Sequence, residues 1–222
     1  MTDITSLKKI FKDQNLLDQA LTHKSWVNEN PTNGTNERLE FLGDAILEYI
    51  VSKELYDRFP DKEEGYLTAL RANLVNTVNL SVISQKLGVG DVLKLSKGEE
   101  ETGGRTNPSL LADTFEAILG ALYIDQGLEI AEKFISKNIL VDIDDKIKLP
   151  LKDAKSRLQE YVQAKGSPAP KYIVVKESGP DHSKEFIIKV VINAKQISIG
   201  EGKSKGEAEQ DAAKKALIAL SL

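Results

Sequence analysis

Apolar residues recur along the first 140 positions at intervals of three and four, the spacing that gathers them on one face of an α-helix. Segments rich in Gly, Pro and Asn interrupt this spacing, for example at 30–34 and 88–90. No stretch in this part alternates convincingly between apolar and polar residues, as a strand would. The pattern predicts a bundle of helices, with long ones over about 37–55 and 110–124.

Beyond residue 150 the apolar spacing changes to two, which is typical of strands with one buried face. Helical spacing precedes this region over 154–164 and follows it from Ser204 to about Leu220. The alternating segments predict three strands with one tight turn, namely Tyr172–Val175, Phe186–Ile192 and Gln196–Ile199, with the turn at Asn193-Ala194. The order α-β-β-β-α predicts a small sheet with two helices packed on one face.

Ser204 and Glu207 mark the start of the last helix. Their Ser-x-x-Glu spacing is that of a capping box, in which the hydroxyl accepts a hydrogen bond from the third helical amide. The carboxylate in turn accepts from the amide of the capping residue. We therefore expect Glu207 to bond back to the backbone N–H of Ser204.

The composition changes between Val141 and Pro150, where Asp and Lys residues are interleaved with single apolar residues. This stretch is predicted to link two domains. The sequence thus divides into an all-α N-terminal domain at residues 1–140, a linker at 141–150 and a small α+β domain at 151–222.

Composition narrows the class of protein. A hydrophobic fraction of 41% and a charged fraction of 29% are ordinary for a globular chain. No apolar run approaches the roughly 18 residues that a bilayer span requires, and the first residues lack the features of a secretory signal. The absence of cysteine excludes disulfides and thiolate ligands. We expect a soluble, cytoplasmic protein without a membrane partner.

Charge is unevenly divided between the two predicted domains. Residues 151–222 hold 13 Lys and Arg against 9 Asp and Glu, a net charge of +4, whereas residues 1–150 carry −8. A basic module joined to an acidic one indicates that binding of a polyanion and a second task are divided between them. Scattered surface charge is the alternative explanation.

Three acidic residues share one face of the helix predicted from residue 37. With about 100° between successive residues, Glu37, Glu40 and Asp44 point away from the apolar stripe of that helix. A solvated acidic face is the simpler explanation of this spacing alone, and Glu48 lies on the same face.

Asp113 and Glu116 are harder to explain as surface residues, because the helix that carries them is apolar on nearly all sides. An ionised carboxylate buried without a partner is so unfavourable that it takes up a proton, pairs with a base or binds a metal. One interpretation is therefore a structural pair with Arg38 or Arg71.

A metal site is the other interpretation. Oxygen ligands alone favour Mg²⁺ or Mn²⁺ over zinc, and two helices that present carboxylates could hold one or two such ions. That arrangement suits the cleavage of phosphodiester bonds. The glycines at 88–90 and 200–202 lack the longer fingerprint of a nucleotide site, so no organic cofactor is expected. His23 is interpreted as a local hydrogen-bonding residue rather than a catalyst.

Phe41 and Gly43 stand out on the same helix. Phe41 points beside the acidic face and away from the core stripe, where a second chain could cover it, although single exposed aromatics are common. Gly43 either allows another helix to approach closely or is simply a small residue in a crowded bundle.

Together these residues resemble the motifs of a known family. Asn36–Ala45, with the sequence NERLEFLGDA, is similar to the characteristic motif of bacterial ribonuclease III. Further stretches match the family in the same order: Leu21–Ser25, Glu64-Gly65, Gly103-Gly104 and Leu111–Ala121. The resemblance covers nearly the whole chain, because the C-terminal part is similar to a double-stranded RNA-binding domain.

The resemblance implies a homodimeric, divalent-metal-dependent endonuclease that cuts double-stranded RNA and leaves 5′-phosphate and 3′-hydroxyl ends. Processing of ribosomal RNA and other structured precursors is implied in the same way. The implied residues are Glu40, Asp44, Asp113 and Glu116 as ligands of Mg²⁺ or its substitute Mn²⁺, Asp44 and Glu116 as catalytic, Glu37 and Glu64 as supporting acidic residues, and Phe41 at the dimer interface.

The resemblance also implies three groups of RNA contacts. They are Ser156, Gln159, Glu160 and Gln163 in one minor groove, Gly179, Pro180, Asp181 and His182 in the next, and Lys203, Ser204 and Lys205 at the intervening phosphates. One position departs from the family, which commonly has a second Lys where this chain has Gly206. We expect weaker or more salt-sensitive RNA binding as a result.

A regulator that binds double-stranded RNA without cutting it is the alternative function. The intact carboxylates at all six matched positions argue against it, because a pure binder gains nothing from acidic groups that face a polyanion.

Overall fold

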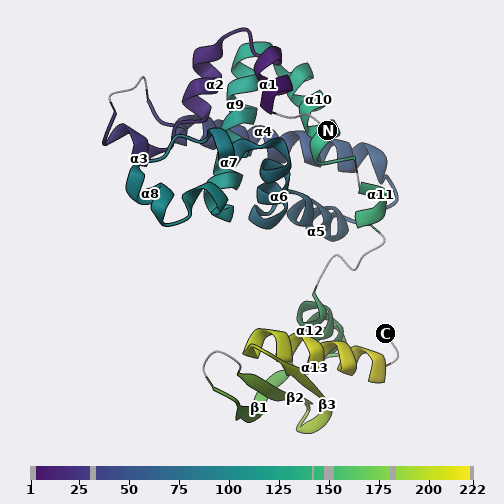
Figure 1. Ribbon diagram of the computed structural model, residues 1–222. Helices are drawn as coiled ribbons and strands as arrows, with labels where there is room; N and C mark the ends of the chain where they lie inside the picture. The colour runs from purple at the N-terminus through teal and green to yellow at the C-terminus, as the bar shows by residue number, and fades with distance from the viewer. Residues whose placement is uncertain (1–3, 31–33, 142, 148–152, 181–183, 221–222) are drawn as a thin grey trace. The chain divides into compact units, whose positions relative to one another are not determined.

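The helical period of the first part of the chain is confirmed by the structure, a computed structural model that describes residues 4–30, 34–141, 143–147, 153–180 and 184–220 (Figure 1). The chain divides into two units, Met1–Leu151 and Lys152–Leu222. The α-helices described in the first unit are α1 (Ile4–Ile10), α2 (Gln14–Ala20), α3 (Lys24–Val27), α4 (Glu37–Arg58), α5 (Glu64–Val75), α6 (Thr77–Leu87), α7 (Val89–Val92), α8 (Lys97–Glu101), α9 (Pro108–Gln126), α10 (Leu128–Asn138) and α11 (Ile143–Lys146). A short 3₁₀-helix, η1 (Gly104–Thr106), precedes α9. None of the helices in these ranges is long and apolar enough to cross a membrane.

Helix α9 is the central element of the first unit, as its nearly continuous apolar sequence predicts. It packs against α2, α4, α6 and α10, and ten of its residues are buried. Its start is well defined, because the side chain of Asn107 accepts from the backbone N–H of Ser109 at 2.9 Å and Pro108 occupies the first helical position. Phe115 of α9 stacks on Phe134 of α10 with ring centroids 5.3 Å apart. This helix therefore has a fixed position against the rest of the core.

The segment just after residue 140 packs with the first unit. Leu140 and Ile143 are buried in its core and Ile147 packs against it, because these apolar residues recur at three- and four-residue spacing. The guanidinium of Arg58 also contacts both carboxylate oxygens of Asp144 at 2.8 Å. The first unit thus extends at least to Ile147, into the stretch that the sequence predicted as a linker.

The second unit has the predicted order of one helix, three strands and one helix (Figure 1). Its strands form one antiparallel sheet in the order β1-β2-β3. Asn193 and Ala194 form the predicted tight turn, with φ of 49° and 62°. The elements are α12 (Ala154–Ala164), β1 (Lys171–Ser178), β2 (Glu185–Ile192), β3 (Lys195–Gly202) and α13 (Lys205–Ala219). An all-α unit followed by a small α+β unit confirms the predicted fold class.

Helix α13 lies directly on the sheet because small residues face each other across the contact. A Cβ atom on Gly200 would lie 2.1 Å from the backbone nitrogen of Ala212, and one on Gly202 would lie 2.5 Å from that of Ala208. Both alanines are fully buried. This close packing fixes the N-terminal end of α13 beside the last residues of β3.

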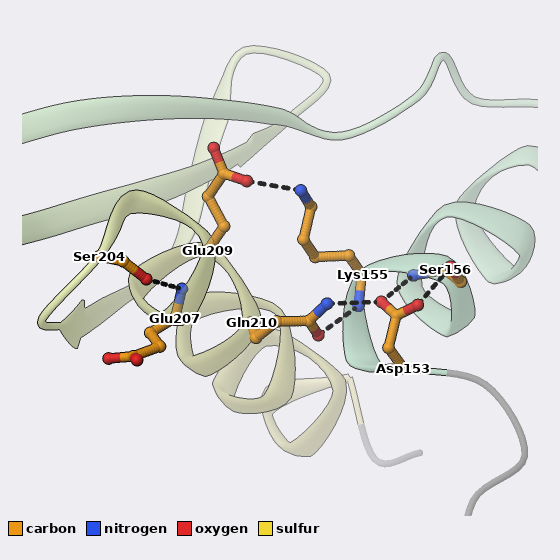
Figure 2. Close-up of polar contacts among 7 residues, drawn as sticks. All are labelled: Asp153, Lys155, Ser156, Ser204, Glu207, Glu209 and Gln210. Atoms are coloured by element: carbon orange, nitrogen blue, oxygen red, sulfur yellow. Dashed lines mark hydrogen bonds and ion pairs between the residues drawn. The ribbon is translucent and has the colours of Figure 1, made fainter. Parts of the chain in front are cut away.

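The start of α13 differs in one detail from the predicted capping box. The hydroxyl of Ser204 accepts from the backbone N–H of Glu207 at 3.2 Å, as expected (Figure 2). The carboxylate of Glu207, however, accepts from the N–H of Lys203 at 2.9 Å and not from that of Ser204. The prediction for this second bond is wrong by one residue, because the extended backbone at Ser204 leaves the preceding N–H within reach of the side chain.

Candidate functional site

Three carboxylates from two helices meet on the first unit. Glu40 of α4 and Asp113 and Glu116 of α9 each have a carboxylate oxygen within 4.8 Å of the other two, the spacing of a group that can hold a metal ion. Asp113 and Glu116 are one turn apart and therefore share a face of α9. All three side chains are partly buried. The geometry brings together three of the four metal ligands that the resemblance implies.

A close helix crossing places these carboxylates next to each other. A Cβ atom on Gly43 of α4 would lie 1.8 Å from the carbonyl oxygen of Glu116, and one on Gly120 of α9 would lie 2.2 Å from that of Leu39. Two helices approach this closely only where both lack side chains at the contact. Of the two explanations for Gly43, the structure therefore supports the close approach of another helix. The acidic residues lie within one turn of this crossing.

The fourth residue, Asp44, lies one turn further along α4 and is exposed. It does not belong to the group within 4.8 Å, but its charge acts on Glu116. Burial first, and then the negative charges of Asp44, Asp113 and Glu40, raises the pKa of Glu116 to about 8. Burial also raises the pKa of Glu40 and that of Asp113. The cluster therefore concentrates negative charge where water stabilises it poorly.

The alternative of a structural pair with arginine is not what the structure shows. Arg71 pairs instead with Glu48, with a distance of 2.7 Å from Nε to the carboxylate, and donates to the hydroxyl of Ser52 at 2.7 Å. Among the described residues no ion pair joins Arg38 to Asp113 or Glu116. The charge of the cluster is therefore not compensated by an ion pair with either arginine.

Removing one charge from the cluster is expected to stabilise the protein when metal is absent. The folded state binds the proton of Glu116 more tightly than an unfolded chain with a pKa near 4.5, so stability is lost as the pH rises from about 4.5 towards about 8. In EDTA at pH 9 we expect the free energy of unfolding of Glu116→Gln to exceed that of wild type by about 1–3 kcal/mol, after allowance for solvent screening. At pH 5 the difference should shrink towards zero.

Urea unfolding at both pH values measures this effect. Glu101→Gln, at an exposed position on α8, is the matched control and should show no such pH dependence. Equal stabilities of wild type and Glu116→Gln at pH 9 would mean that the charge of Glu116 is compensated within the chain.

A small cavity of about 190 Å³ adjoins Glu40 and Asp113. His23 and Lys24 supply its basic groups. As predicted, His23 has a local role: its Nδ1 accepts from the backbone N–H of Ser25 at 3.3 Å and caps α3, and burial lowers its pKa. The reasoning from sequence did not single out Lys24, although its place directly after His23 in a matched motif was a usable signal.

The two supporting acidic residues are placed differently. Glu37 is exposed beside the cavity and pairs with Lys24 at 3.3 Å. Glu64 begins α5, accepts from the hydroxyl of Thr68 at 2.8 Å and lines a separate groove of about 820 Å³. A single chain therefore brings Glu37, but not Glu64, close to the cluster. Phe41 is 80% exposed, in agreement with its position on the helical wheel.

The predicted RNA contacts of the second unit lie along one helix, at the start of another helix and directly after one strand. Ser156, Gln159, Glu160 and Gln163 are all on α12, and Lys203, Ser204 and Lys205 are exposed at the start of α13. Gly179 and Pro180 are exposed directly after β1, with a φ of 95° at Gly179. Asp181 and His182 lie outside the described residues. Gly206 is in the first turn of α13, and a Cβ atom there would meet only the hydroxyl of Ser204 at 4.0 Å.

Comparisons with known proteins agree with this division of the chain. A family model described as ribonuclease-III-like matches residues 13–143, and a model of the double-stranded RNA binding motif matches residues 154–220. The first match contains the acidic cluster, and the second contains α12, the sheet and α13.

Curated relatives match over almost the whole chain. Ribonuclease 3 of Geobacillus kaustophilus is 48% identical over 212 residues, which cover 95% of this chain and 86% of the relative. Ribonuclease 3 of Halalkalibacterium halodurans is 44% identical over 220 residues, or 98% of this chain and 84% of the relative.

Solved structures resemble the first unit. The nuclease domain of ribonuclease III from Campylobacter jejuni superposes with a TM-score of 0.57 and 41% identity, covering 64% of this chain and 97% of that one. A second structure of that domain concerns structural flexibility in a region involved in dimer formation. It superposes with a TM-score of 0.56 and 42% identity, covering 62% of this chain and 99% of that one. With both domains matched in order along most of its length, this chain belongs to the ribonuclease III family and is an endoribonuclease.

Proposed function

We propose that this endoribonuclease cleaves the phosphodiester bonds of double-stranded RNA with the help of a divalent cation and leaves 5′-phosphate and 3′-hydroxyl ends. The observation that carries the proposal is the cluster of Glu40, Asp113 and Glu116, whose carboxylates form no ion pair with Arg38 or Arg71 among the described residues. A regulator that only binds RNA has no use for such a cluster, because its charge repels a polyanion.

The donor set fits a hard cation. All ligating atoms are carboxylate oxygens, which favour Mg²⁺, with Mn²⁺ as a substitute. Glu40, Asp44, Asp113 and Glu116 would hold the ion. When bound, a divalent cation supplies positive charge at the scissile phosphate and lowers the pKa of water.

The residues of the chain have separate tasks in this proposal. Asp44 and Glu116 act as the catalytic carboxylates at the reacting phosphate, and Glu40 and Asp113 hold the site in place. Glu37 keeps Lys24 beside the site through their ion pair. Glu64 is assigned a supporting role from the opposite side of a dimer, since a single chain leaves it apart from the cluster.

We further propose a homodimer with one acidic site in each subunit. Phe41 supports this, because a large apolar side chain that is 80% exposed next to the site favours cover by a second chain. The related Campylobacter domain has a region involved in dimer formation. Two sites related by a two-fold axis would each cut one strand and give a staggered break.

The second domain is proposed to provide most of the affinity for the duplex. A-form RNA offers a wide, shallow minor groove lined by 2′-hydroxyls, so recognition depends mainly on shape. Residues of α12 and the segment with Gly179, Pro180 and His182 would enter successive minor grooves. Lys203 and Lys205 would contact the phosphates between them at the positive end of α13. Ribosomal RNA and other structured precursors in the cytoplasm are the proposed substrates.

One assay tests the proposal against its alternative. The full chain is incubated with a long end-labelled RNA duplex in Mg²⁺, in Mn²⁺ or in EDTA, and the products are separated on a denaturing gel. We expect cutting in either cation and none in EDTA, with products that a 5′-phosphate-dependent exonuclease degrades.

Two results would contradict the proposal. Cutting that persists in EDTA would exclude the proposed role of the carboxylates. A duplex that is bound but uncut in every condition would favour the RNA-binding regulator.

A further inference from the structure

Asp153, the residue before α12, has a carboxylate that three hydrogen bonds hold in place (Figure 2). Its Oδ1 accepts from the backbone N–H of Ser156 at 3.1 Å and from the side-chain amide of Gln210 at 2.7 Å. Its Oδ2 accepts from the hydroxyl of Ser156 at 2.8 Å. The bond from Gln210, followed by those from Ser156, lowers the pKa of Asp153 to about 2. At neutral pH this carboxylate is ionised and can only accept.

Gln210 is itself held in one orientation. Its Oε1 accepts from the backbone N–H of Lys155 at 3.3 Å, while its Nε2 donates to Asp153. Because both ends of the amide are used, the nitrogen must face the carboxylate. The ammonium of Lys155 pairs with Glu209, next to Gln210 on α13 (Figure 2). It also lies 5.1 Å from the centre of the Tyr172 ring. Contacts from α13 thus fix the start of α12.

The hydroxyl of Ser156 is polarised by this arrangement. A hydroxyl has one proton to donate and two lone pairs that accept. The proton of Ser156 points to Oδ2 of Asp153, so the lone pairs are what Ser156 offers to a ligand. Gln159 and Gln163, further along the helix, carry amides that offer both a donor and an acceptor. Ser156 is therefore a position on this face whose hydrogen-bonding polarity is set by a charged neighbour.

Building on the proposed contact of α12 with duplex RNA, we propose that Asp153 is a positioning residue that makes Ser156 an acceptor and thereby selects a hydrogen-bond donor in the minor groove. The ribose 2′-hydroxyl is such a donor, and DNA lacks it. Asp153 does not touch the RNA in this proposal. Its role is to prevent Ser156 from donating, while Gln210 keeps the carboxylate from turning.

Asp153→Asn tests this role with little change in shape. Asn caps a helix as well as Asp does, and its amide oxygen can still accept from the N–H of Ser156 and from Gln210. Its NH₂ group then faces the hydroxyl of Ser156, which must accept and turn its own proton outward. We expect affinity for an RNA duplex, measured with the full chain in EDTA, to fall about 3- to 10-fold. Affinity for the same duplex with 2′-fluoro riboses, which cannot donate, should not change.

Separate controls test whether the loss of charge or a loss of stability in Asp153→Asn could account for weaker RNA binding. Asp153→Asn removes a negative charge, which by itself would strengthen binding to a polyanion, so the expected effect has the opposite sign. Glu201→Gln removes one charge at an exposed position on β3 and should bind RNA no more weakly than wild type. Thermal unfolding of Asp153→Asn should show a modest loss of stability, because the cap and the contact with Gln210 remain but are no longer strengthened by the charge of the carboxylate. Binding is therefore compared well below the melting temperature of both proteins.

Ser156→Ala separates this inference from the function on which it rests. We expect it to weaken RNA binding as much as Asp153→Asn does, and the double variant to bind no more weakly than Ser156→Ala alone. If Ser156→Ala weakens binding and Asp153→Asn does not, the role of Asp153 is refuted while the RNA contact stands. If Ser156→Ala binds like wild type, the proposed contact of Ser156 fails, and the role of Asp153 fails with it.

Discussion

Glu116→Gln is expected to abolish the cleavage of duplex RNA without loss of folding or RNA binding. The change keeps the shape of the side chain and removes one charge from the centre of the carboxylate cluster. Removal of a single preorganised electrostatic partner at a reacting group typically costs about 10²- to 10³-fold in kcat, and a lost ligand weakens cation binding as well. Single-turnover cleavage of an end-labelled duplex in Mg²⁺ measures the rate, and binding in EDTA measures affinity.

Two further variants make this test specific. Asp44→Asn should lose cleavage to a similar extent, although Asp44 is exposed and lies outside the closest group of carboxylates. Glu101→Gln removes an exposed carboxylate from α8 in the same domain and should cut at the wild-type rate. If Glu116→Gln cuts within a few-fold of wild type, the cluster is not the catalytic site, whatever its affinity for metal ions.

The opposite effects expected for Glu116 on stability and on activity have one cause. Burial and neighbouring charges raise the pKa of Glu116 to about 8. Its ionised form is therefore unfavourable in the folded chain when no cation is bound. The same crowding creates a strong site for a hard cation, because the ion relieves the repulsion. A purely structural carboxylate would instead be paired with a base, as Glu48 is with Arg71.

The faces of individual helices could be predicted from the sequence because they depend only on local periodicity. The wheel from residue 37 placed Glu40 and Asp44 away from the core, and the apolar sequence around Asp113 and Glu116 predicted a central helix. Periodicity does not say which two helices cross, or at which residue. Gly43 alone was open to two explanations, and its meaning became clear only with Gly120, 77 positions away, on the other side of the contact.

Contacts between distant polar residues were missed for the same reason. Asp153 and Gln210 are 57 positions apart, and nothing in the local sequence of either residue indicates the other. The composition of residues 141–150 predicts a linker there, yet the side chain of Ile143 is buried in the first unit. The family resemblance indicates which residues belong to the catalytic and RNA-binding sites. The structure adds which of their side chains are close together and which of them donate or accept hydrogen bonds.

Gly43→Ala is expected to destabilise the first domain and to disrupt its site together. The added Cβ would lie 1.8 Å from the carbonyl oxygen of Glu116, and that atom belongs to the backbone of a buried helix, so it cannot move aside as a flexible side chain would. Helices α4 and α9 must separate or rotate. Overpacking of this kind costs about 3 kcal/mol in the free energy of unfolding, which urea unfolding in EDTA measures.

Separation of the helices also moves Glu40 away from Asp113 and Glu116, so the stabilisation of wild type by added Mg²⁺ should be much smaller in Gly43→Ala. Gly65→Ala is the matched control, because a Cβ at Gly65 of α5 meets no atom within 4 Å and the change should alter stability by no more than about 1 kcal/mol. If Gly43→Ala is as stable as wild type and keeps its response to Mg²⁺, the two helices do not depend on backbone contact at this crossing. Stability and the response to Mg²⁺ are expected to fall together, because the contact of Gly43 with the backbone of Glu116 both packs α4 against α9 and sets the distance between the carboxylates.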